Sequence, residues 1–303
     1  MSLDSSTRST IDIPALLAAL PTRIAEIPAL AAARDPQHVA LIEEARRLTN
    51  AQLLEAVDAA AALLREWGVR GGDRVMIVAE NSIVQIVLLF ATAKLDAWAL
   101  VSNARLSAAE LDAIRAHAQP RVVAYAVESS TDAQQHAQRH QAVTAPAVTP
   151  DIGAWSYTID TTAKAEPVEA ANDRQCAALI YTTGTTGAPK GVMLSHRNLL
   201  FIAAVSSRLR KVGPDDVVYA VLPISHVYGF ASVCLGSLHA GATLRLVPRF
   251  TPEAVRRALA EERVSISRET SHGSTGGFQA VFVSGMIWKP SADARRLSAA
   301  MLR

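Results

Sequence analysis

The residues best suited to chemistry lie in one short segment, Tyr181–Gly191, which reads YTTGTTGAPKG. Its glycines allow the backbone to bend so that amide N–H groups point inward and form a concave anion-binding site. Its threonine hydroxyls add uncharged donors, and Lys190 adds a mobile cation for phosphate oxygens. The segment therefore predicts a polyphosphate site built from Thr182, Thr183, Gly184, Thr185, Thr186, Gly187 and Lys190.

The spacing within this loop separates it from another phosphate-binding loop. A Walker A loop requires Gly-Lys-Ser/Thr at a set distance from its first glycine, whereas Lys190 follows Pro189 and precedes Gly191. The remaining alternative is a Thr- and Gly-rich turn that binds nothing. The density of hydroxyls, glycines and a lysine within so few residues favours the phosphate site.

Two series of alternating strands and helices are expected to position the loop. The first opens with a helix at 49–68, where Thr49 and Gln52 form a capping-box pattern. Further strands are expected at 74–79, 97–101 and 121–126, and further helices at 84–93 and 107–117, the last opened by Ser107 and Glu110. This βαβαβ order predicts a mostly parallel sheet with helices on its faces.

The second series begins near residue 175 and carries the loop. Ser195 is predicted to cap one of its helices, and Thr251 followed by Pro252 is predicted to start another. Strands are expected at 177–181, 191–194, 217–222 and 243–247, and helices at 196–209, 230–239 and 253–262. The expected fold class is α/β, with two βαβ-type subdomains and mostly parallel sheets.

Between the two series, residues 128–174 are rich in Ala, Gln, Thr and Pro and predict a surface connection with one or two short elements. His136 and His140 are four residues apart there, a spacing that suits a metal ion on a helix. Because no acidic or cysteine pattern accompanies them, they are predicted to be a solvated surface pair, and no metal site is predicted.

Composition excludes several classes of protein. The 303 residues are 50% apolar and 19% charged, which is enough apolar material for a substantial core. Thirty basic and 28 acidic side chains leave a net charge of +2, which gives no support for a nucleic-acid partner. Two cysteines cannot form a disulfide framework, and the N-terminus lacks the pattern of a signal peptide. A cytoplasmic location is therefore expected.

One stretch, Val217–Leu244, has no Asp, Glu, Lys or Arg across 28 residues, which is long enough to span a bilayer. It contains Pro223 and several glycines and serines, and its two ends are β-like. A buried strand-helix-strand segment is therefore predicted, with a membrane helix as the alternative. No transmembrane segment is expected.

The loop and its neighbours resemble a known family signature. YTTGTTGAPKGV followed by LSHRNLL is similar to the phosphate-binding signature of the adenylate-forming superfamily, which includes acyl-CoA synthetases, aryl-CoA ligases, luciferases and nonribosomal adenylation domains. RVMIVAENS and NARLSAAELDAI upstream, and LPISHVYGF downstream, resemble further segments of that family. The resemblance implies the fold of the family's N-terminal domain.

The resemblance also implies an activity. Enzymes of this family join a carboxylic acid to ATP with release of pyrophosphate, and a thiol, usually coenzyme A, then takes the acyl group. The loop residues named above are implied to bind the ATP phosphates, with Mg²⁺ alongside. The expected partners are thus small molecules: a carboxylic acid, ATP and coenzyme A. A carboxylate is already a nucleophile at neutral pH, so catalysis rests on orientation and charge stabilisation.

His226 lies in the second matching segment. In the family, its position holds an aromatic residue or a histidine that borders the carboxylate and the acyl pocket, so the resemblance implies a catalytic and substrate-binding role. The alternative is a histidine satisfied within an apolar core. Tyr228 and Gly229 are implied to line the acyl pocket.

The resemblance fades after about Val264. The last segment, 265–303, contains no Gly-x-Pro loop and none of the family's adenine, ribose, hinge or lid-lysine motifs. The expected organisation is an N-terminal subdomain at 1–174, a partial second subdomain at 175–264 and an atypical tail at 265–303. A truncated ligase, inactive as this chain alone, is expected. The alternative is a non-catalytic nucleotide- or phosphate-binding module or a regulatory partner of a full-length ligase.

Overall fold

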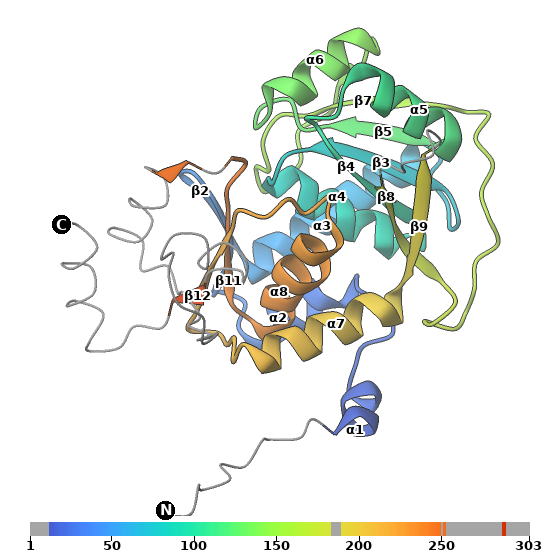
Figure 1. The fold of residues 1–303 in the computed structure, drawn as a ribbon. Helices are drawn as coiled ribbons and strands as arrows, with labels where there is room; N and C mark the ends of the chain where they lie inside the picture. Colours follow the sequence, from blue (N-terminus) through green and yellow to red (C-terminus); the bar gives the residue numbers. More distant parts are fainter. Residues whose placement is uncertain (1–11, 183–188, 250, 253–286, 289–303) are drawn as a thin grey trace, which may run out of the picture.

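The structure, a computed structural model, describes residues 12–182, 189–249, 251–252 and 287–288. Two mixed sheets dominate it (Figure 1). The larger, seven-stranded sheet has the order β6-β7-β5-β3-β4-β8-β9. Its strands are β3 (Arg74–Ala79), β4 (Trp98–Asn103), β5 (Val122–Tyr125), β6 (Val143–Thr144), β7 (Ser156–Ile159), β8 (Cys176–Thr182) and β9 (Lys190–Ser195). The central strands β5, β3, β4 and β8 are parallel, and β7, β6 and β9 add antiparallel edges.

The five-stranded sheet has the order β12-β10-β11-β1-β2. Its strands are β1 (Val39–Glu43), β2 (Arg46–Thr49), β10 (Val217–Ala220), β11 (Thr243–Leu246) and β12 (Ile287–Trp288). The three inner strands are parallel, and the outer strands β2 and β12 are antiparallel. The expected α/β class with mostly parallel central strands is therefore confirmed.

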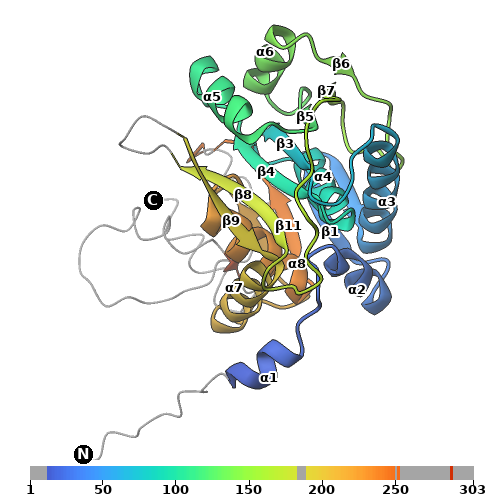
Figure 2. The ribbon, with the colours of Figure 1, turned by 90° about the vertical axis from the view of Figure 1, so that its right-hand side faces the viewer.

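Helices fill the space between the sheets and cover the larger one. The helical elements are α1 (Ile13–Ala18), α2 (Glu26–Arg34), α3 (Asn50–Glu66), α4 (Ile83–Lys94), α5 (Ala108–Ala118), α6 (Thr131–Arg139), α7 (His196–Leu209), the π-helix η1 (Tyr228–Leu235) and α8 (Gly236–Ala240). Helix α4 contacts both β3 and β1, and all its residues except Lys94 are buried, as expected for a helix that is apolar on every side. Helices α5 and α6 lie on the opposite face of the larger sheet (Figures 1 and 2).

The pleat of β3 shows how the two cores are separated. Val75 and Ile77 point into the main core, which contains residues of both sheets and the helices between them. Met76 and Val78 point the other way, into a smaller core under α5 and α6. Successive side chains of a strand face opposite sides, so one short apolar run supports both cores.

Local signals predicted the helix starts well. The predicted capping boxes at Thr49 and Ser107 are present, and Ser195, predicted as a cap, forms a capping box with Asn198. Each hydroxyl accepts the backbone N–H three residues on. The predicted strand 74–79 and helix 196–209 match β3 and α7. The helix expected at 253–262 lies outside the described residues.

The segment 128–174 differs from the predicted surface connection. It contains α6, β6 and β7, and β7 pairs with β5 in the larger sheet. The prediction that His136 and His140 form a solvated pair is wrong. His136 is buried, and its Nε2 donates to the carbonyl oxygens of Ala104 and Leu106, because α6 turns this face toward the smaller core. His140 bonds to the hydroxyl of Tyr125 through Nδ1, at 2.5 Å.

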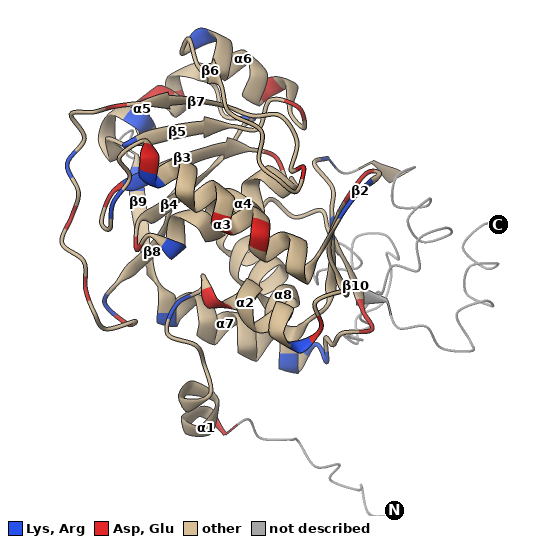
Figure 3. Ribbon diagram, turned by 180° about the vertical axis from the view of Figure 1, so that it is seen from behind, with Lys and Arg blue, Asp and Glu red and all other residues tan. Residues whose placement is uncertain are grey.

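The uncharged stretch 217–244 forms β10, η1, α8 and the start of β11, which confirms the predicted strand-helix-strand arrangement. Within the described ranges, no helix combines the length and apolarity needed to cross a membrane. Figure 3 shows acidic and basic residues interspersed along the ribbon, in keeping with the small net charge.

The two sheets do not divide the chain at residue 174. The larger sheet includes β8 and β9 beside β4, and the smaller sheet includes β1 and β2 beside β11. The predicted subdomain boundaries at 174 and 264 stay a prediction.

Candidate functional site

The two ends of the phosphate-type loop are held together by β-pairing. Strand β8 ends at Thr182 and antiparallel β9 begins at Lys190, and these two residues are direct partners in the register. Both side chains are exposed. The polar hydroxyl and the ammonium group therefore project at the same end of one strand pair. The other five predicted donors, Thr183, Gly184, Thr185, Thr186 and Gly187, lie outside the described residues.

Tyr181 anchors the base of the loop. Its hydroxyl lies 2.7 Å from Nδ1 of His117, on α5, and the two rings meet edge to face. Its ring also covers Gly191, its partner on β9, where an added Cβ would lie only 3.0 Å from the ring. Partial burial raises the pKa of Tyr181, which keeps the phenol protonated and able to donate. This contact fixes the strand end from which Thr182 follows.

Helix α7 begins directly after β9 and anchors the strand pair from its other end. Ser195 accepts the N–H of Asn198, and the Asn198 side chain accepts the N–H of Ser195. His196 is fully buried, and its Nδ1 accepts the N–H of Ile24 at 3.1 Å. Burial, assisted by the charge of Arg23, lowers the pKa of His196 to about 3, so the ring is neutral.

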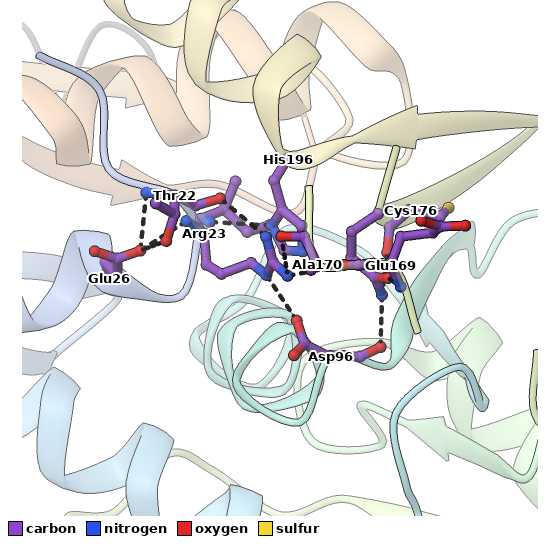
Figure 4. A network of polar contacts seen from close by, with 10 residues as sticks. Thr22, Arg23, Glu26, Asp96, Glu169, Ala170, Cys176 and His196 are labelled. Atoms are coloured by element: carbon purple, nitrogen blue, oxygen red, sulfur yellow. Dashed lines mark hydrogen bonds and ion pairs between the residues drawn. The ribbon is translucent and has the colours of Figure 1, made fainter. Parts of the chain in front are cut away.

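Figure 4 shows the contacts that surround this histidine. The guanidinium of Arg23 donates to Asp96 at 2.8 Å and to the carbonyl oxygen of Glu169 at 3.1 Å. The side chain of Gln175 donates to the carbonyl oxygen of Asp96 at 2.9 Å. These bonds join the N-terminal segment, the α4–β4 turn and the residues that flank the β8–β9 strand pair at one place.

The second predicted group lies after β10. The N–H of His226 donates to the carbonyl oxygen of Pro223, and the carbonyl oxygen of His226 accepts from Phe230. The His226 side chain is exposed, so it is not the buried core histidine of the alternative interpretation. Its Nδ1 accepts the N–H of Tyr228 at 3.3 Å, which leaves Nε2 directed away from that bond. The imidazole of His226 is therefore accessible to solvent at this turn.

Tyr228 and Gly229 complete this turn. Tyr228 is half-buried and packs against the main core, and Gly229 is buried. A Cβ on Gly229 would lie 2.2 Å from the carbonyl oxygen of Pro223, so the close approach of helix and turn depends on glycine. The predicted lining role of these two residues stays a prediction.

Each predicted group follows the carboxyl end of a parallel strand. Thr182 is the last residue of β8, which runs parallel to β4, and His226 follows β10, which runs parallel to β11 in the smaller sheet. In open α/β sheets, ligands bind beyond the carboxyl ends of parallel strands.

Some residues of this site were missed by sequence reasoning. The pairing of His117 with Tyr181 joins an exposed helix position to a strand end, and no local pattern marks it. Asn81 lies within the family-like segment RVMIVAENS and was not predicted as a site residue, yet its side chain accepts the N–H of Ile224, two residues before His226. A buried, polar residue directly after an apolar strand was the available signal.

Comparison with known proteins places the chain in a family. The model of the AMP-binding enzyme family matches residues 29–268, so the chain belongs to that family of AMP-binding enzymes. It is 32% identical over 222 residues to the long-chain-fatty-acid–CoA ligase FadD13 of Mycobacterium tuberculosis, covering 73% of this chain and 44% of that protein. It is 33% identical over 239 residues to indoleacetate–CoA ligase of Aromatoleum aromaticum, covering 77% and 46%. The chain thus spans under half the length of these relatives.

A solved structure shows the same fold. The inhibitor-bound N-terminal domain of FACL13 from Mycobacterium tuberculosis matches with a TM-score of 0.63 and 28% identity, over 80% of this chain and 62% of that one. The arrangement of sheets and helices described above is therefore that of the N-terminal domain of adenylate-forming enzymes.

Proposed function

We propose that this chain supplies the phosphate-binding and acid-binding surfaces of an ATP-dependent carboxylate-activating enzyme that forms coenzyme A thioesters. The observation that carries the proposal is the pairing of Thr182 with Lys190 at the carboxyl edge of the larger sheet, within a family of AMP-binding enzymes. The relatives are CoA ligases with an aliphatic or an aromatic acid in their names. Both acid classes are therefore candidates.

The proposed reaction has two displacement steps. A carboxylate oxygen attacks the α-phosphorus of ATP, a new P–O bond forms, and the bond to the β-phosphate breaks to release pyrophosphate. The sulfur of coenzyme A then attacks the acyl carbon, and AMP leaves as the thiol proton passes to solvent. Neither step changes an oxidation state, so no redox partner is required.

The roles proposed for this chain follow from charge and position. Lys190 and Thr182, with the loop between them, bind the phosphate oxygens and stabilise the charge that moves onto pyrophosphate. Mg²⁺ is proposed to arrive with the nucleotide phosphates and to reduce their charge. His226 borders the carboxylate and orients it, and Tyr228 and Gly229 line the acyl pocket. A cytoplasmic location, where ATP and coenzyme A are available, is part of the proposal.

The test compares nucleotide binding by the full chain and by two lysine variants. Lys190→Ala is expected to weaken ATP binding about tenfold or more, because a charge-assisted contact is lost. Lys164→Ala is the matched control, since Lys164 is also exposed but lies beside Arg74 at the opposite, amino end of β3. Titration calorimetry with Mg-ATP measures both. Equal affinity for ATP in Lys190→Ala and the wild type would contradict the phosphate role.

A second measurement separates activation from binding alone. Exchange of labelled pyrophosphate into ATP is measured with octanoate and with benzoate as acids. Exchange that depends on either acid supports carboxylate activation. ATP binding without exchange, lost in Lys190→Ala, supports the non-catalytic nucleotide-binding module instead.

A further inference from the structure

A single buried amide joins the two sheets beside the proposed acid-binding turn. Asn81 follows β3 and is only 3% exposed. Its Nδ2 donates to the carbonyl oxygens of Ala220 and Leu222, each at 2.9 Å, and its Oδ1 accepts the N–H of Ile224, also at 2.9 Å. The partners lie 139 to 143 residues further along the chain.

These three bonds hold the backbone directly before His226. Ala220 is the last residue of β10, and Leu222 and Ile224 are alternate residues of the segment that follows. Ile224 is fully buried, and the next backbone bond joins His226 to Pro223. The position of His226 is therefore set by a turn whose entry is bound to Asn81.

The backbone on either side of Asn81 is also held by hydrogen bonds. Ser82 caps α4 by accepting the N–H of Gln85, and the N–H of Ile83 donates to Glu43 of β1 at 2.8 Å. Glu80 accepts from Arg249, beyond β11, at 3.0 Å. Asn81 thus projects from a short segment that is already bound to the smaller sheet on two sides.

We propose that Asn81 is a positioning residue for the acid-binding turn, holding residues 221–229 and thereby fixing where the turn presents His226. The role of Asn81 in acid binding rests on the proposed function. Its hydrogen bonds to the turn do not depend on that function. An amide is required because it carries two donors and an acceptor on one planar group. A carboxylate of the same shape would direct an oxygen at two carbonyl oxygens.

The chain offers a matched pair of substitutions. Asn81→Asp keeps the shape but replaces the donor that serves Ala220 and Leu222. Asn50→Asp is the control, because Asn50 is also buried, at 5% exposed, and its Nδ2 donates to the carbonyl oxygen of Asp35 far from the turn. Both variants remove a buried amide donor, which serves the carbonyl oxygens of Ala220 and Leu222 at Asn81 and that of Asp35 at Asn50.

Hydrogen exchange read by mass spectrometry tests the link without any ligand. In Asn81→Asp, amide exchange across 221–230 is expected to rise about tenfold or more over wild type, because buried donors and acceptors lose their partners. Asn50→Asp is expected to leave that segment unchanged. If amide exchange at 221–230 in Asn81→Asp stays within about twofold of wild type, the segment has not become more open, and the proposal is overturned.

A second variant covers the case in which Asn81→Asp does not fold. Asn81→Ser retains a small donor and removes the bridging amide. A rise in exchange that is larger at 221–230 than elsewhere supports the proposal, and a uniform rise over the whole chain overturns it.

Acid-dependent pyrophosphate exchange then distinguishes this inference from the proposed function. With octanoate or benzoate as probe, Asn81→Asp is expected to raise the KM for the acid while the Kd for ATP stays unchanged. A parallel loss of ATP binding overturns a role specific to the turn. Equal ATP affinity in Lys190→Ala and the wild type would make the proposed function fail. If the wild type shows no exchange with either acid, as expected of this chain alone, the hydrogen-exchange comparison still decides whether Asn81 holds the turn.

Discussion

At the scale of single residues, Gly229 leaves no room for a side chain beside Pro223. The helix η1 starts immediately after a sharp turn, and an added methyl group would overlap the carbonyl oxygen of Pro223 at 2.2 Å. The backbone must shift to relieve that overlap, and the shift would displace the residues that present His226.

Gly229→Ala is therefore expected to lower the free energy of unfolding by about 1–3 kcal/mol, as overpacked core sites do. Gly213→Ala is the control, because nothing lies within 4 Å of a Cβ there and its backbone is not left-handed. Urea denaturation of both variants measures the difference. Equal stability of the two variants would show that the turn adjusts without strain.

His196 is the residue whose charge state is most affected by the fold. Its pKa falls from an ordinary 6.5 to about 3 because the ring is buried and lies near Arg23. Between pH 6.5 and about 3, the unfolded chain binds a proton at His196, whereas the folded chain keeps the ring neutral. The stability from this group is therefore fully present above pH 6.5 and is lost as the pH falls toward 3.

Replacing His196 should consequently change the pH dependence of stability. In His196→Asn, whose Oδ1 can still accept the N–H of Ile24, the decrease in stability below pH 6 is expected to be shallower by up to about 1.4 kcal/mol per pH unit. Denaturant titrations between pH 4 and 8 would measure this, and parallel profiles for His196→Asn and wild type would contradict it.

At the scale of elements, the β9–α7 junction is governed by the capping box at Ser195 and Asn198. Ser195→Ala is expected to cost about 1 kcal/mol of stability, because the first turn of α7 loses an acceptor for a backbone N–H. Ser195→Thr retains the hydroxyl and is expected to retain most of the stability. Thermal denaturation compares the three proteins, and an unchanged midpoint in Ser195→Ala would show that β9 alone holds the helix start.

Elements were predicted unequally well by the sequence, for identifiable reasons. Helix caps and capping boxes depend on residues close together in the chain, so Thr49, Ser107 and Ser195 marked helix starts without reference to the rest of the chain. The π-helix at 228–235 was expected only as an ordinary helix near 230–239, because its wider turn depends on how the buried segment packs. The orientation of α6, which buries His136, likewise depends on the sheet beneath it.

At the scale of the whole molecule, each sheet is assembled from distant parts of the chain. Strand β1 lies beside β11, and β4 lies beside β8. Residues 175–264 alone would therefore leave β8 and β11 with unpaired edges and expose apolar surface that β1 and β4 normally cover.

We accordingly expect the fragment 175–264, expressed alone, to show no cooperative unfolding transition and little dispersion of its amide NMR signals. Expression together with residues 1–174 is expected to restore a cooperative transition. A cooperative transition for 175–264 alone would establish it as an independent subdomain and would favour the division predicted at residue 174.

The sequence by itself determined the class of fold, the main helix starts and strands, and the loop whose residues suit a phosphate group. These features depend on residues close together in the chain, where side-chain type and spacing act directly on the backbone. Only the tertiary structure decided which strands are neighbours, that Asn81 binds the turn before His226, and that Tyr181 is held by His117. Buried apolar strands have similar patterns and are interchangeable by local rules, so their partners are selected by the packing of the whole chain.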